Sequence, residues 1–551
     1  MVLTCILLCL GQQGYLPSSS PQAPDARRQW MEVRQEGAFL VDHAPKDWKR
    51  VRPGGNHGVA ATAKLAAAVL SPRWQVDDLG QLWRGDAVAI GDSGAWMLGG
   101  KGFESEGVVA YPTGDPIALF DHDLTDALAV RPAVAARAGR LATMATFNTG
   151  FFSFESTIYS WELDVSGVPA WTYDLPNTGN VMAGFLGISE DGSRTVAAVS
   201  NTNGTTHVRV LDVDGVELHT YDLPASSNIR FGAIDAAGDR LYLGMFNGTS
   251  ELWDLQSGTL LTSLVLDWYY AAIFKHYGNF LGITVVREST PGVWSLLAFR
   301  PGNLFHFPGP LDLSADGSRC GFIDQRFFPG FDHFEVGLWD VENDVDLFVD
   351  SHDAPGTTTQ LVASGLQLDD RGKVLGGISW GDSFNLTPEV FVYDEFGTMT
   401  SSMDLPGSAL SVGMDPDGGT VVVGSMDQHE NQGGGGGSIL CLDAVEQKLH
   451  ITGFPQLGGM ITLSTGDDAQ TAIFTISKAL GVSSSPYGPT LVDLDERLTT
   501  TLLHTIPAGG LALPLLVPTK AGLADQALHF QGLRFDPAPA FTNKVSVHLV
   551  P

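Results

Sequence analysis

A spaced pair of short motifs occurs three times and limits the folds open to this chain. Each copy has an aspartate and a glycine three positions apart, then an Asp-Leu-Pro triplet whose aspartate lies ten positions after the first. The copies span residues 164–176, 212–224 and 394–406. An apolar run precedes each copy, and Asp and Gly between such runs favour hairpin turns. The repeat therefore predicts an all-β chain built from similar antiparallel meanders.

A second turn, usually Asp-Gly, marks the start of an apolar strand in successive modules, as at 191–192, 316–317 and 417–418. Counting these marks gives modules of about 45 residues through a region that we bound at 84–447. Four-stranded repeats of this length predict a β-propeller, because each sheet buries both faces only by packing between neighbours. Eight blades are favoured. The module at 271–310 is the weakest, so seven blades are the alternative.

Two modules end their third strand in Trp-Asp, at residues 253–254 and 339–340. Together with the Asp-x-x-Gly turns, this pattern resembles WD40-like and related bacterial β-propeller repeats. The Gly-His half of the WD40 signature is not kept. The resemblance implies the propeller fold and assigns no activity.

From residue 448 the pattern changes to short alternating strands, which predict a small C-terminal β-sandwich over 448–551. The Gly-x-Pro opening at 453–455 and the Phe-Gln-Gly-Leu-x-Phe-Asp-Pro block at 530–537 resemble the C-terminal β domain of secreted planctomycete-type bacterial proteins. This resemblance implies export or surface display in a bacterium, and no catalytic activity.

The N-terminus begins with an apolar run, Val2–Leu10, that is too short to span a bilayer and suits the core of a signal peptide. We therefore expect residues 1–14 to be a signal peptide and the protein to be secreted or at the cell surface, with the periplasm as an alternative. Residues 15–83 are predicted to be an N-terminal extension or linker. Their basic cluster, including 46–52, is either a solvated tether or a segment that docks on the acidic body.

The charge balance excludes several partners. The chain has 62 acidic and 31 basic residues, a formal net charge of −31. Nucleic acids and anionic membranes need a positive footprint, so neither is expected as a partner. No internal run is long enough to predict a membrane span. We expect a monomer that binds a protein or a glycan, in which Cys320 and Cys441 are small buried residues.

Catalytic and metal motifs are not found, which favours a non-catalytic protein without committing to one. The sequence has no Gly-x-Ser-x-Gly elbow, His-Glu-x-x-His pair or Walker loop. The Asp-rich turns at 212–215 and 415–419 resemble the start of a calcium loop, but they lack its further ligands and its final glutamate. Turn formation explains them better, so no catalytic residue, metal or other cofactor is predicted.

Aromatic residues next to acidic ones occur in the loops between the second and third strands of several modules. Such loops gather on one face of a propeller, where aromatic rings suit sugar stacking or a protein hot spot. The alternative is that the rings fold back and pack on the blade edges. The candidate binding residues are Phe151, Phe152, Phe154, Phe327, Phe328, Phe331, His333, Trp380, Phe384 and His429.

The sequence favours a secreted, non-catalytic β-propeller that binds a protein or glycan through these loops. One alternative is a propeller enzyme, such as a lactonase, another hydrolase or a quinone-type dehydrogenase, with its site at the channel mouth. Another alternative is a structural envelope or matrix protein.

Overall fold

The structure is a computed structural model that describes residues 30–34 and 37–41 and most of the chain between residues 68 and 549. Interruptions of at most ten residues divide the latter part. They include 78–87, 151–152, 266–274, 327–330, 383–385 and 430–435. The described residues form strands, turns and loops, and among them no helix is long and apolar enough to cross a membrane.

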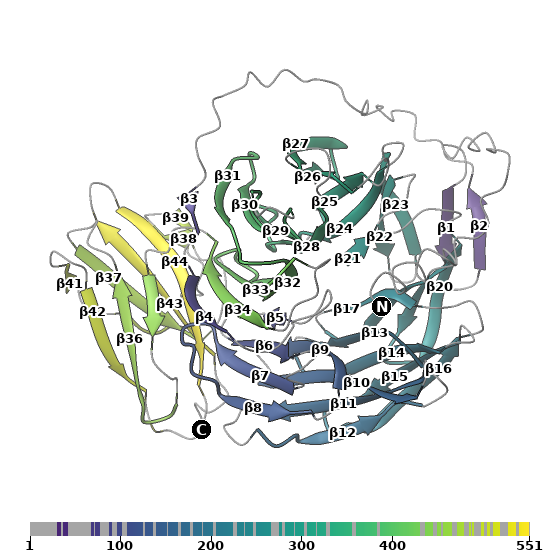
Figure 1. The fold of residues 1–551 in the computed structure, drawn as a ribbon, viewed down its shortest axis with the longest axis horizontal. Coiled ribbons are helices and arrows are strands. Elements are labelled where there is room, and N and C mark those ends of the chain that lie inside the picture. The colour runs from purple at the N-terminus through teal and green to yellow at the C-terminus, as the bar shows by residue number, and fades with distance from the viewer. Residues whose placement is uncertain are drawn as a thin grey trace.

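Antiparallel sheets stand around a common axis, each with one strand near the axis and its last strand at the rim (Figure 1). The first sheet contains β5 (Val88–Ile90), β6 (Trp96–Lys101), β7 (Gly107–Pro112) and β8 (Phe120–Asp123). The next two four-stranded units join into one sheet through the pair Phe154↔Asn180. They contain β9 (Ala127–Ala135), β10 (Arg140–Gly150), β11 (Ser153–Glu162), β12 (Trp171–Asp174), β13 (Asn180–Ile188), β14 (Thr195–Asn201), β15 (Thr206–Leu211) and β16 (Glu217–Leu223).

The remaining sheets of the ring follow in chain order. Their strands are β17 (Ile229–Ile234), β18 (Arg240–Met245), β19 (Thr249–Asp254), β20 (Thr259–Val265), β21 (Lys275–Tyr277), β22 (Gly282–Thr290), β23 (Val293–Pro301), β24 (His306–Leu313), β25 (Arg319–Arg326), β26 (His333–Asp340), β27 (Val345–Asp353), β28 (Ala363–Leu368), β29 (Val374–Ser379), β30 (Val390–Asp394), β31 (Met399–Met403), β32 (Ala409–Met414), β33 (Thr420–Met426) and β34 (Gly437–Asp443).

The innermost strands contact one another in the order β5, β9, β13, β17, β21, β24, β28, β32 and back to β5. The ring is therefore closed. All-β sheets placed radially around an axis, each packed between two others, form a β-propeller, so the predicted fold class is confirmed at this level.

The N-terminal segment supplies outer strands to sheets made much later in the chain. β4 (Pro72–Val76) pairs antiparallel with β34, and β3 (Ala68–Val69) pairs parallel with β31. A hairpin of β1 (Trp30–Arg34) and β2 (Gly37–Val41) joins β23. β3 and β4 fall within the predicted N-terminal extension of residues 15–83, yet both pair with strands of the ring. The last sheet takes its fourth strand from β4.

Contacts of Arg73 and Trp74 fix β4 between the last sheet and the first. The Arg73 guanidinium donates to the carboxylate of Asp443, with Nε 3.0 Å from Oδ1, and to the Thr420 hydroxyl at 3.3 Å. It also donates to the carbonyl of Thr113 at 3.0 Å, and the Trp74 indole donates to that carbonyl at 2.9 Å. Thr113 lies in the connection between β7 and β8 of the first sheet. Because β4 pairs with the last sheet and bonds to this connection, it joins the last sheet to the first and closes the ring.

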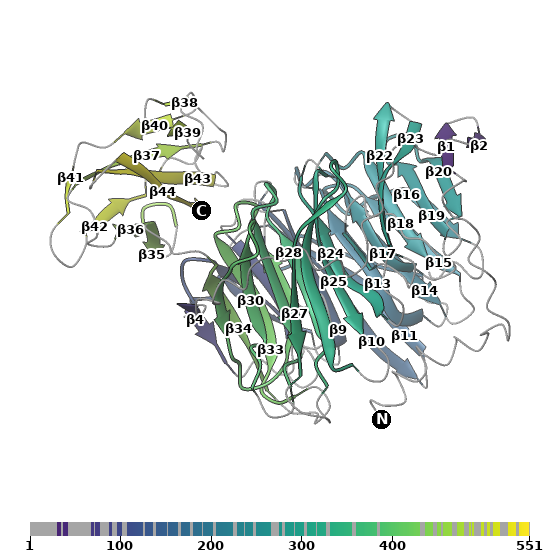
Figure 2. The same ribbon diagram turned by 90° about the horizontal axis from the view of Figure 1, so that it is seen from above.

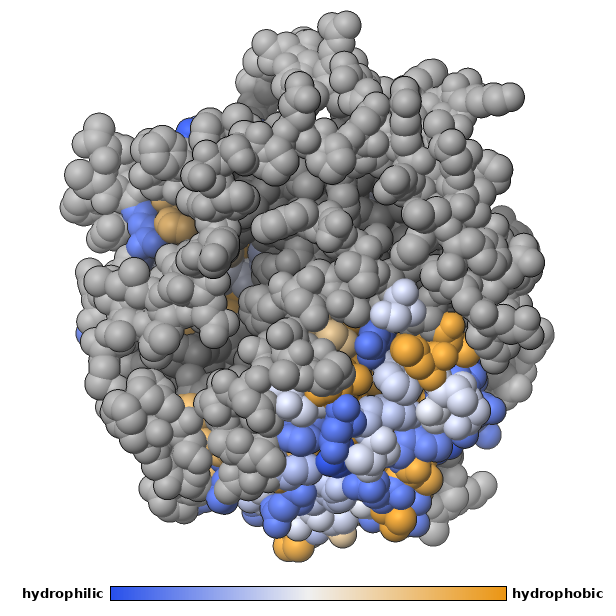
Figure 3. Space-filling view, turned by 90° about the vertical axis from the view of Figure 1, so that its right-hand side faces the viewer, coloured by the Kyte–Doolittle hydropathy of each residue, from blue (hydrophilic) through white to orange (hydrophobic). Residues whose placement is uncertain are grey.

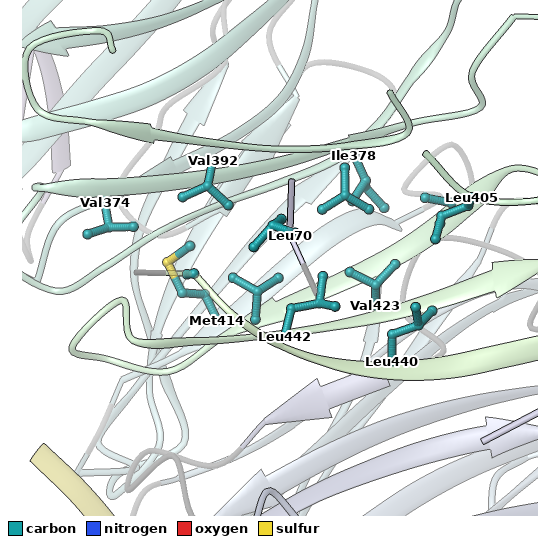
Figure 4. Close-up of a cluster of buried hydrophobic side chains, with 13 residues drawn as sticks. Leu70, Val374, Ile378, Val392, Leu405, Met414, Val423, Leu440 and Leu442 are labelled. Carbon is teal, nitrogen blue, oxygen red and sulfur yellow. The ribbon is translucent and has the colours of Figure 1, made fainter. Parts of the chain in front are cut away.

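Apolar layers between the sheets form the core. Figure 4 shows one such layer, in which side chains of β29 and β30 point toward those of β33 and β34. Leu70, which lies between β3 and β4, inserts into the same layer. The alternating apolar positions of each strand are thus buried against the next sheet.

The Asp-Gly turns are structural. In the β28–β29 turn the Asp369 carboxylate accepts the backbone N–H of Val374 at 2.8 Å, and Gly372 has φ of +66°, which favours glycine. Neighbouring turns also bond to one another, since Asp370 donates its N–H to the Pro416 carbonyl at 2.9 Å. One turn therefore both closes on itself and joins two sheets.

The C-terminal region lies beside the ring (Figure 2) and has its own apolar core. One sheet contains β35 (Leu449–Thr452), β36 (Met460–Thr465) and β42 (Leu511–Leu516). The other contains β37 (Thr471–Ser477), β40 (Arg497–Thr500), β41 (His504–Thr505), β43 (Ala527–Phe535) and β44 (Pro539–His548). β38 (Ser484–Ser485) and β39 (Gly488–Pro489) pair separately. Residues 453–455 and 536–537, from the two motifs that suggested this region's resemblance, lie outside the described residues.

Candidate functional site

The two ends of the sheets carry different connections. The turn face carries the connections from first to second strand and from third to fourth strand. The loop face carries the connections from second to third strand and from one sheet to the next. Two hydrogen bonds show that the latter connections meet: Trp380 N–H donates to the Val362 carbonyl at 2.8 Å, and the Ser408 hydroxyl donates to the Trp380 carbonyl at 2.8 Å.

Half of the predicted binding residues lie outside the described part of the chain, namely Phe151, Phe152, Phe327, Phe328 and Phe384. The others are placed. Phe154 is partly buried in β11, and Phe331 and His333 are partly buried around the start of β26. Trp380, which follows β29, is partly buried, whereas His429, which follows β33, is only 7% exposed.

Gln325 fixes the loop between β25 and β26. Its side-chain amide is buried and donates to the carbonyls of His333 at 3.0 Å and Leu361 at 3.2 Å. Its amide oxygen accepts the N–H of Ala363 at 3.0 Å. The Leu361 N–H in turn donates to the Phe331 carbonyl at 2.5 Å. One glutamine thus joins this loop to the connection that leads into the next sheet.

Ion pairs hold the base of the same loop. Arg326 donates to the Asp332 carboxylate from two nitrogens, at 3.0 and 2.8 Å. The His333 ring lies across the strand pair from Asp353, with Nδ1 2.8 Å from its carboxylate oxygen. His333 is therefore engaged within its own blade.

Asp382 closes the loop between β29 and β30 on itself. Its carboxylate is 3% exposed and accepts the N–H of Leu386, the N–H of Thr387 and the Thr387 hydroxyl, each at 2.8 Å. The side chain of Leu386 is held on the outside of this turn and is 65% exposed. An apolar side chain that is exposed beside such a hydrogen-bonded backbone is suited to binding, since little ordering entropy is lost on contact.

Trp380 and His429 are brought together from neighbouring sheets. The His429 ring lies with Nε2 3.3 Å from the carbonyl of Gly381, the residue after Trp380. Ser408 bonds to the Trp380 carbonyl from the connection between the same two sheets. Of the sequence-predicted residues, these two therefore share one corner of the loop face, and both help to hold it.

Glu389, which immediately precedes β30, is a buried carboxyl on the loop face that is not among the sequence-predicted residues. Its side chain is 1% exposed, and burial, followed by the charges of Asp404 and Asp382, raises the pKa of its carboxyl to about 8. Its Oε2 accepts the N–H of Leu405 at 2.6 Å. The carboxyl thus closes the end of the Asp-Leu-Pro motif, and it contacts backbone rather than an open site. A glutamate before an apolar strand gives no sequence signal for this role.

The aspartates considered for calcium bind their own turns. Asp212 Oδ1 accepts the N–H groups of Asp214 at 2.9 Å and Val216 at 2.8 Å. Asp415 does the same for Gly419 and Thr420, at 2.7 and 2.9 Å. Within the described residues no group of three or more His, Cys, Asp and Glu side chains is arranged to hold a metal ion.

The two cysteines of the ring are buried and unpaired, as expected. Cys320 lies in β25 and Cys441 in β34, and each is fully buried. Burial raises the pKa of both thiols, that of Cys441 to about 12. They contribute to packing as small apolar residues.

Similarity to known proteins was found among solved structures and not by sequence. No family model and no curated protein matches this sequence. Among solved structures, the chain is similar to the β-propeller domain of Cps50 (Swd1) from Myceliophteria thermophila, at 10% sequence identity and a TM-score of 0.40. The match covers 68% of this chain and 99% of that domain.

Proposed function

We propose that this protein is a non-catalytic β-propeller that binds a protein or a glycan through its loop face. The observation that carries the proposal is that the buried Asp382 carboxylate accepts the backbone N–H groups of Leu386 and Thr387 while the Leu386 side chain is 65% exposed. The partly buried Trp380 and the engaged Phe331 loop flank it on the same face. Ordered apolar residues next to acidic ones match the hot-spot chemistry of protein and carbohydrate recognition.

The wider organisation that we propose is a ring of eight blades with a C-terminal β-sandwich. Support for eight comes from the eight strands of the closed inner series. In the weak 271–310 module, β22 and β23 form a sheet with β1 and β2, whereas β21 pairs with β24 of the following sheet. Support for the sandwich comes from the single core shared by the β36 and β37 sheets, in which Leu463 and Phe474 are both buried.

We further propose that the protein is exported, and that the C-terminal module serves display or sorting. Support comes from the apolar run at residues 2–10 and the sequence resemblance of the C-terminal region. Fractionation of the native host, with mass spectrometry of the mature N-terminus, tests export. A protein recovered in the cytosol with residues 1–14 still attached contradicts it.

The binding proposal is tested with the purified full chain on glycan and peptide arrays, followed by affinity measurement for any ligand found. Leu386→Ala, Trp380→Ala and Phe331→Ala are each expected to weaken binding by roughly tenfold or more. Phe396→Ala is the matched control, because Phe396 is 80% exposed on the turn face. Binding that depends on Phe396 and ignores the other three overturns the assignment of the loop face.

A further inference from the structure

Glu389 lies between two connections of the loop face. Its Oε2 accepts the N–H of Leu405, from the β31–β32 connection, at 2.6 Å. Its backbone carbonyl accepts the N–H of Ser379, from the β29–β30 connection, at 2.8 Å. A Cβ added to Gly381 would overlap the Glu389 Oε1, so the carboxyl is packed directly against that second connection. One buried side chain therefore holds the two connections together.

Both partners of this contact are themselves anchored. The Leu405 side chain is 2% exposed and lies in the apolar layer with Ile378 and Val423 (Figure 4). On the other side, the carbonyl of Trp380 accepts the Ser408 hydroxyl at 2.8 Å. We call residues 379–381 and 404–408 the Trp380 corner. Movement of the Glu389 carboxyl therefore requires movement of this corner.

The charges around the Glu389 carboxyl are negative. Asp382 faces it from the β29–β30 connection and Asp404 from the β31–β32 connection. Asp382 accepts three hydrogen bonds, which favour its charged form. Residues 374–447, which include the strands on both sides, contain neither lysine nor arginine. A charge on Glu389, which is 1% exposed, would therefore be buried next to other carboxylates without a cation from these strands.

The β33–β34 connection contributes the remaining titratable groups of this corner. Asp427 lies against Gly436, at the other end of its own connection. The His429 ring lies with Nε2 3.3 Å from the Gly381 carbonyl. Because a carbonyl only accepts, the ring donates from Nε2 in its neutral and charged forms alike. Titration of His429 therefore leaves this hydrogen bond in place, and Glu389 is the group whose ionisation changes the corner.

Acidic residues on the β16 side of the ring are placed differently. The Asp222 side chain is 53% exposed, and it accepts a hydrogen bond from Arg209 Nη1 at 3.0 Å. The surface on this side is largely hydrophilic, with separate hydrophobic spots (Figure 3). Water and a guanidinium therefore stabilise the Asp222 carboxylate, whereas Glu389 is withdrawn from water.

We propose that Glu389 is a proton-dependent latch of the loop face, whose neutral carboxyl holds the Trp380 corner closed and whose ionisation opens it. On loss of the proton, repulsion by Asp404 and Asp382 and the lost hydration are relieved only when the two connections move apart. Burial first, and these two charges second, raise the pKa of the Glu389 carboxyl to about 8, which agrees in direction. The latch is a property of the fold, and its effect on binding rests on the function proposed above.

The direction of the pH dependence follows from the two arrangements. The open corner exposes the Glu389 carboxyl, whose ordinary pKa is 4.5, and the closed corner raises this pKa to about 8. The closed corner therefore holds more protons between these two values. Its advantage over the open corner is complete below pH 4.5 and is lost as the pH rises to about 8. Within this window the open population is expected to grow about tenfold per pH unit.

Native-state hydrogen exchange of the full-length protein measures this opening. Protection factors, which correct for the intrinsic exchange rate at each pH, are followed in peptides covering 378–381 and 404–408. In the wild type they are expected to fall about tenfold per pH unit from pH 5.5 to pH 7.5. In Glu389→Gln they are expected to stay constant, because the amide has no proton to lose. A pH dependence that is the same in both proteins, or absent from both, overturns the proposal.

Two further variants keep the test specific. Asp404 is exposed, and Asp404→Asn removes a charge that raises the pKa of Glu389, so the loss of protection is expected to end at a lower pH. This variant still decides the question if Glu389→Gln does not fold, because an unchanged window contradicts the latch. Glu251→Gln is the matched control: burial also raises the pKa of Glu251, which accepts the Trp253 indole N–H at 3.1 Å in another sheet. Glu251→Gln is expected to keep the wild-type pH dependence, and loss of that dependence in both glutamine variants overturns the proposal.

The effect on binding is measured by probing the glycan and peptide arrays with fluorescently labelled full-length protein at pH 5.5 and pH 8.5. Spots that Leu386→Ala abolishes are expected to be weaker at pH 8.5 by roughly threefold or more for the wild type, and equal at both pH values for Glu389→Gln. Opening by hydrogen exchange without any Leu386-dependent spot supports the latch and contradicts the proposed function. Leu386-dependent spots that are equal at both pH values in the wild type overturn the regulation of binding by the latch.

Discussion

The turn face and the loop face of this propeller are organised in opposite ways. On the turn face the same device recurs, as when Asp369 and Asp415 each accept backbone N–H groups of their own turns. On the loop face the two connections described above are held differently, by Gln325 in one sheet and by Asp382 in the next. The turns that join neighbouring sheets must recur from sheet to sheet, so they are visible in the sequence as a repeat. The face that is free to vary is the one on which we place binding.

Glu389 gives the strongest test of the division between a structural turn face and a binding loop face. It lies at the loop face, yet its contacts stabilise the fold. Folding raises the pKa of its carboxyl from 4.5 to about 8, so the unfolded chain releases this proton first as the pH rises. The stability that the neutral carboxyl contributes is complete below about pH 4.5 and is lost between pH 4.5 and pH 8. Glu389→Gln keeps a neutral amide in its place and is expected to be more stable than the wild type by roughly 4 kcal/mol above pH 8.

Denaturant unfolding of both proteins at pH 5 and pH 9 measures this difference. The gap between variant and wild type is expected to be small at pH 5 and to widen at pH 9. A gap that is the same at both pH values shows that the Glu389 carboxyl is not held neutral by the fold.

Arg73 tests the structural role of the turn face, because its contacts lie at the turn-face end of the last sheet. Arg73→Ala leaves the Asp443 carboxylate, 24% exposed, without its guanidinium and weakens the hold of β4. We expect a loss of about 3 kcal/mol in the free energy of unfolding. Arg140→Ala is the control: its partner Glu162 is 60% exposed, so about 0.5 kcal/mol is expected. Equal losses in thermal unfolding contradict the ring-closing role of β4.

Substitution of two glycines on the turn face distinguishes the cost of backbone strain from the cost of close packing. Gly397 has φ of +80°, and a Cβ added there meets the Phe348 Cβ at 2.5 Å. Gly317 has φ of +69° and nothing within 4 Å of such a Cβ. Gly397→Ala is expected to cost about 2 kcal/mol, from strain plus displacement of Phe348, whereas Gly317→Ala costs about 1 kcal/mol from strain alone. Equal costs in chemical denaturation show that the turns do not pack on the preceding sheet.

Much of the fold could be predicted from the sequence because the constraint is local and repeated. The Asp-x-x-Gly turn of residues 212–215 needs both its aspartate and its glycine, and its recurrence at 164–167 and 394–397 is visible as spacing. β4 could not be found in this way. Residues 72–76 form a lone strand without a hairpin partner, and their place is set by Asp443, which lies 370 positions away along the chain.

The site was less predictable because exposure and engagement are tertiary properties. Trp380 and His429 look alike as loop aromatics, yet His429 is 7% exposed and bonded to the neighbouring loop. Leu386 is an ordinary apolar residue in the sequence, and only the buried Asp382 carboxylate makes it a fixed, exposed one. Glu389 gains its raised pKa from burial and from two other carboxylates, which no spacing rule records.

The most direct test of the division between the faces measures stability and binding on the same set of variants. Leu386→Ala and Trp380→Ala represent the loop face, and Gly397→Ala represents the turn face. Thermal unfolding and affinity for an array-identified ligand are measured for each. The loop variants are expected to lose binding while their midpoints change little, and the glycine variant is expected to lower the midpoint while its folded fraction binds normally. Loss of binding in the turn variant, with normal binding in both loop variants, contradicts the account.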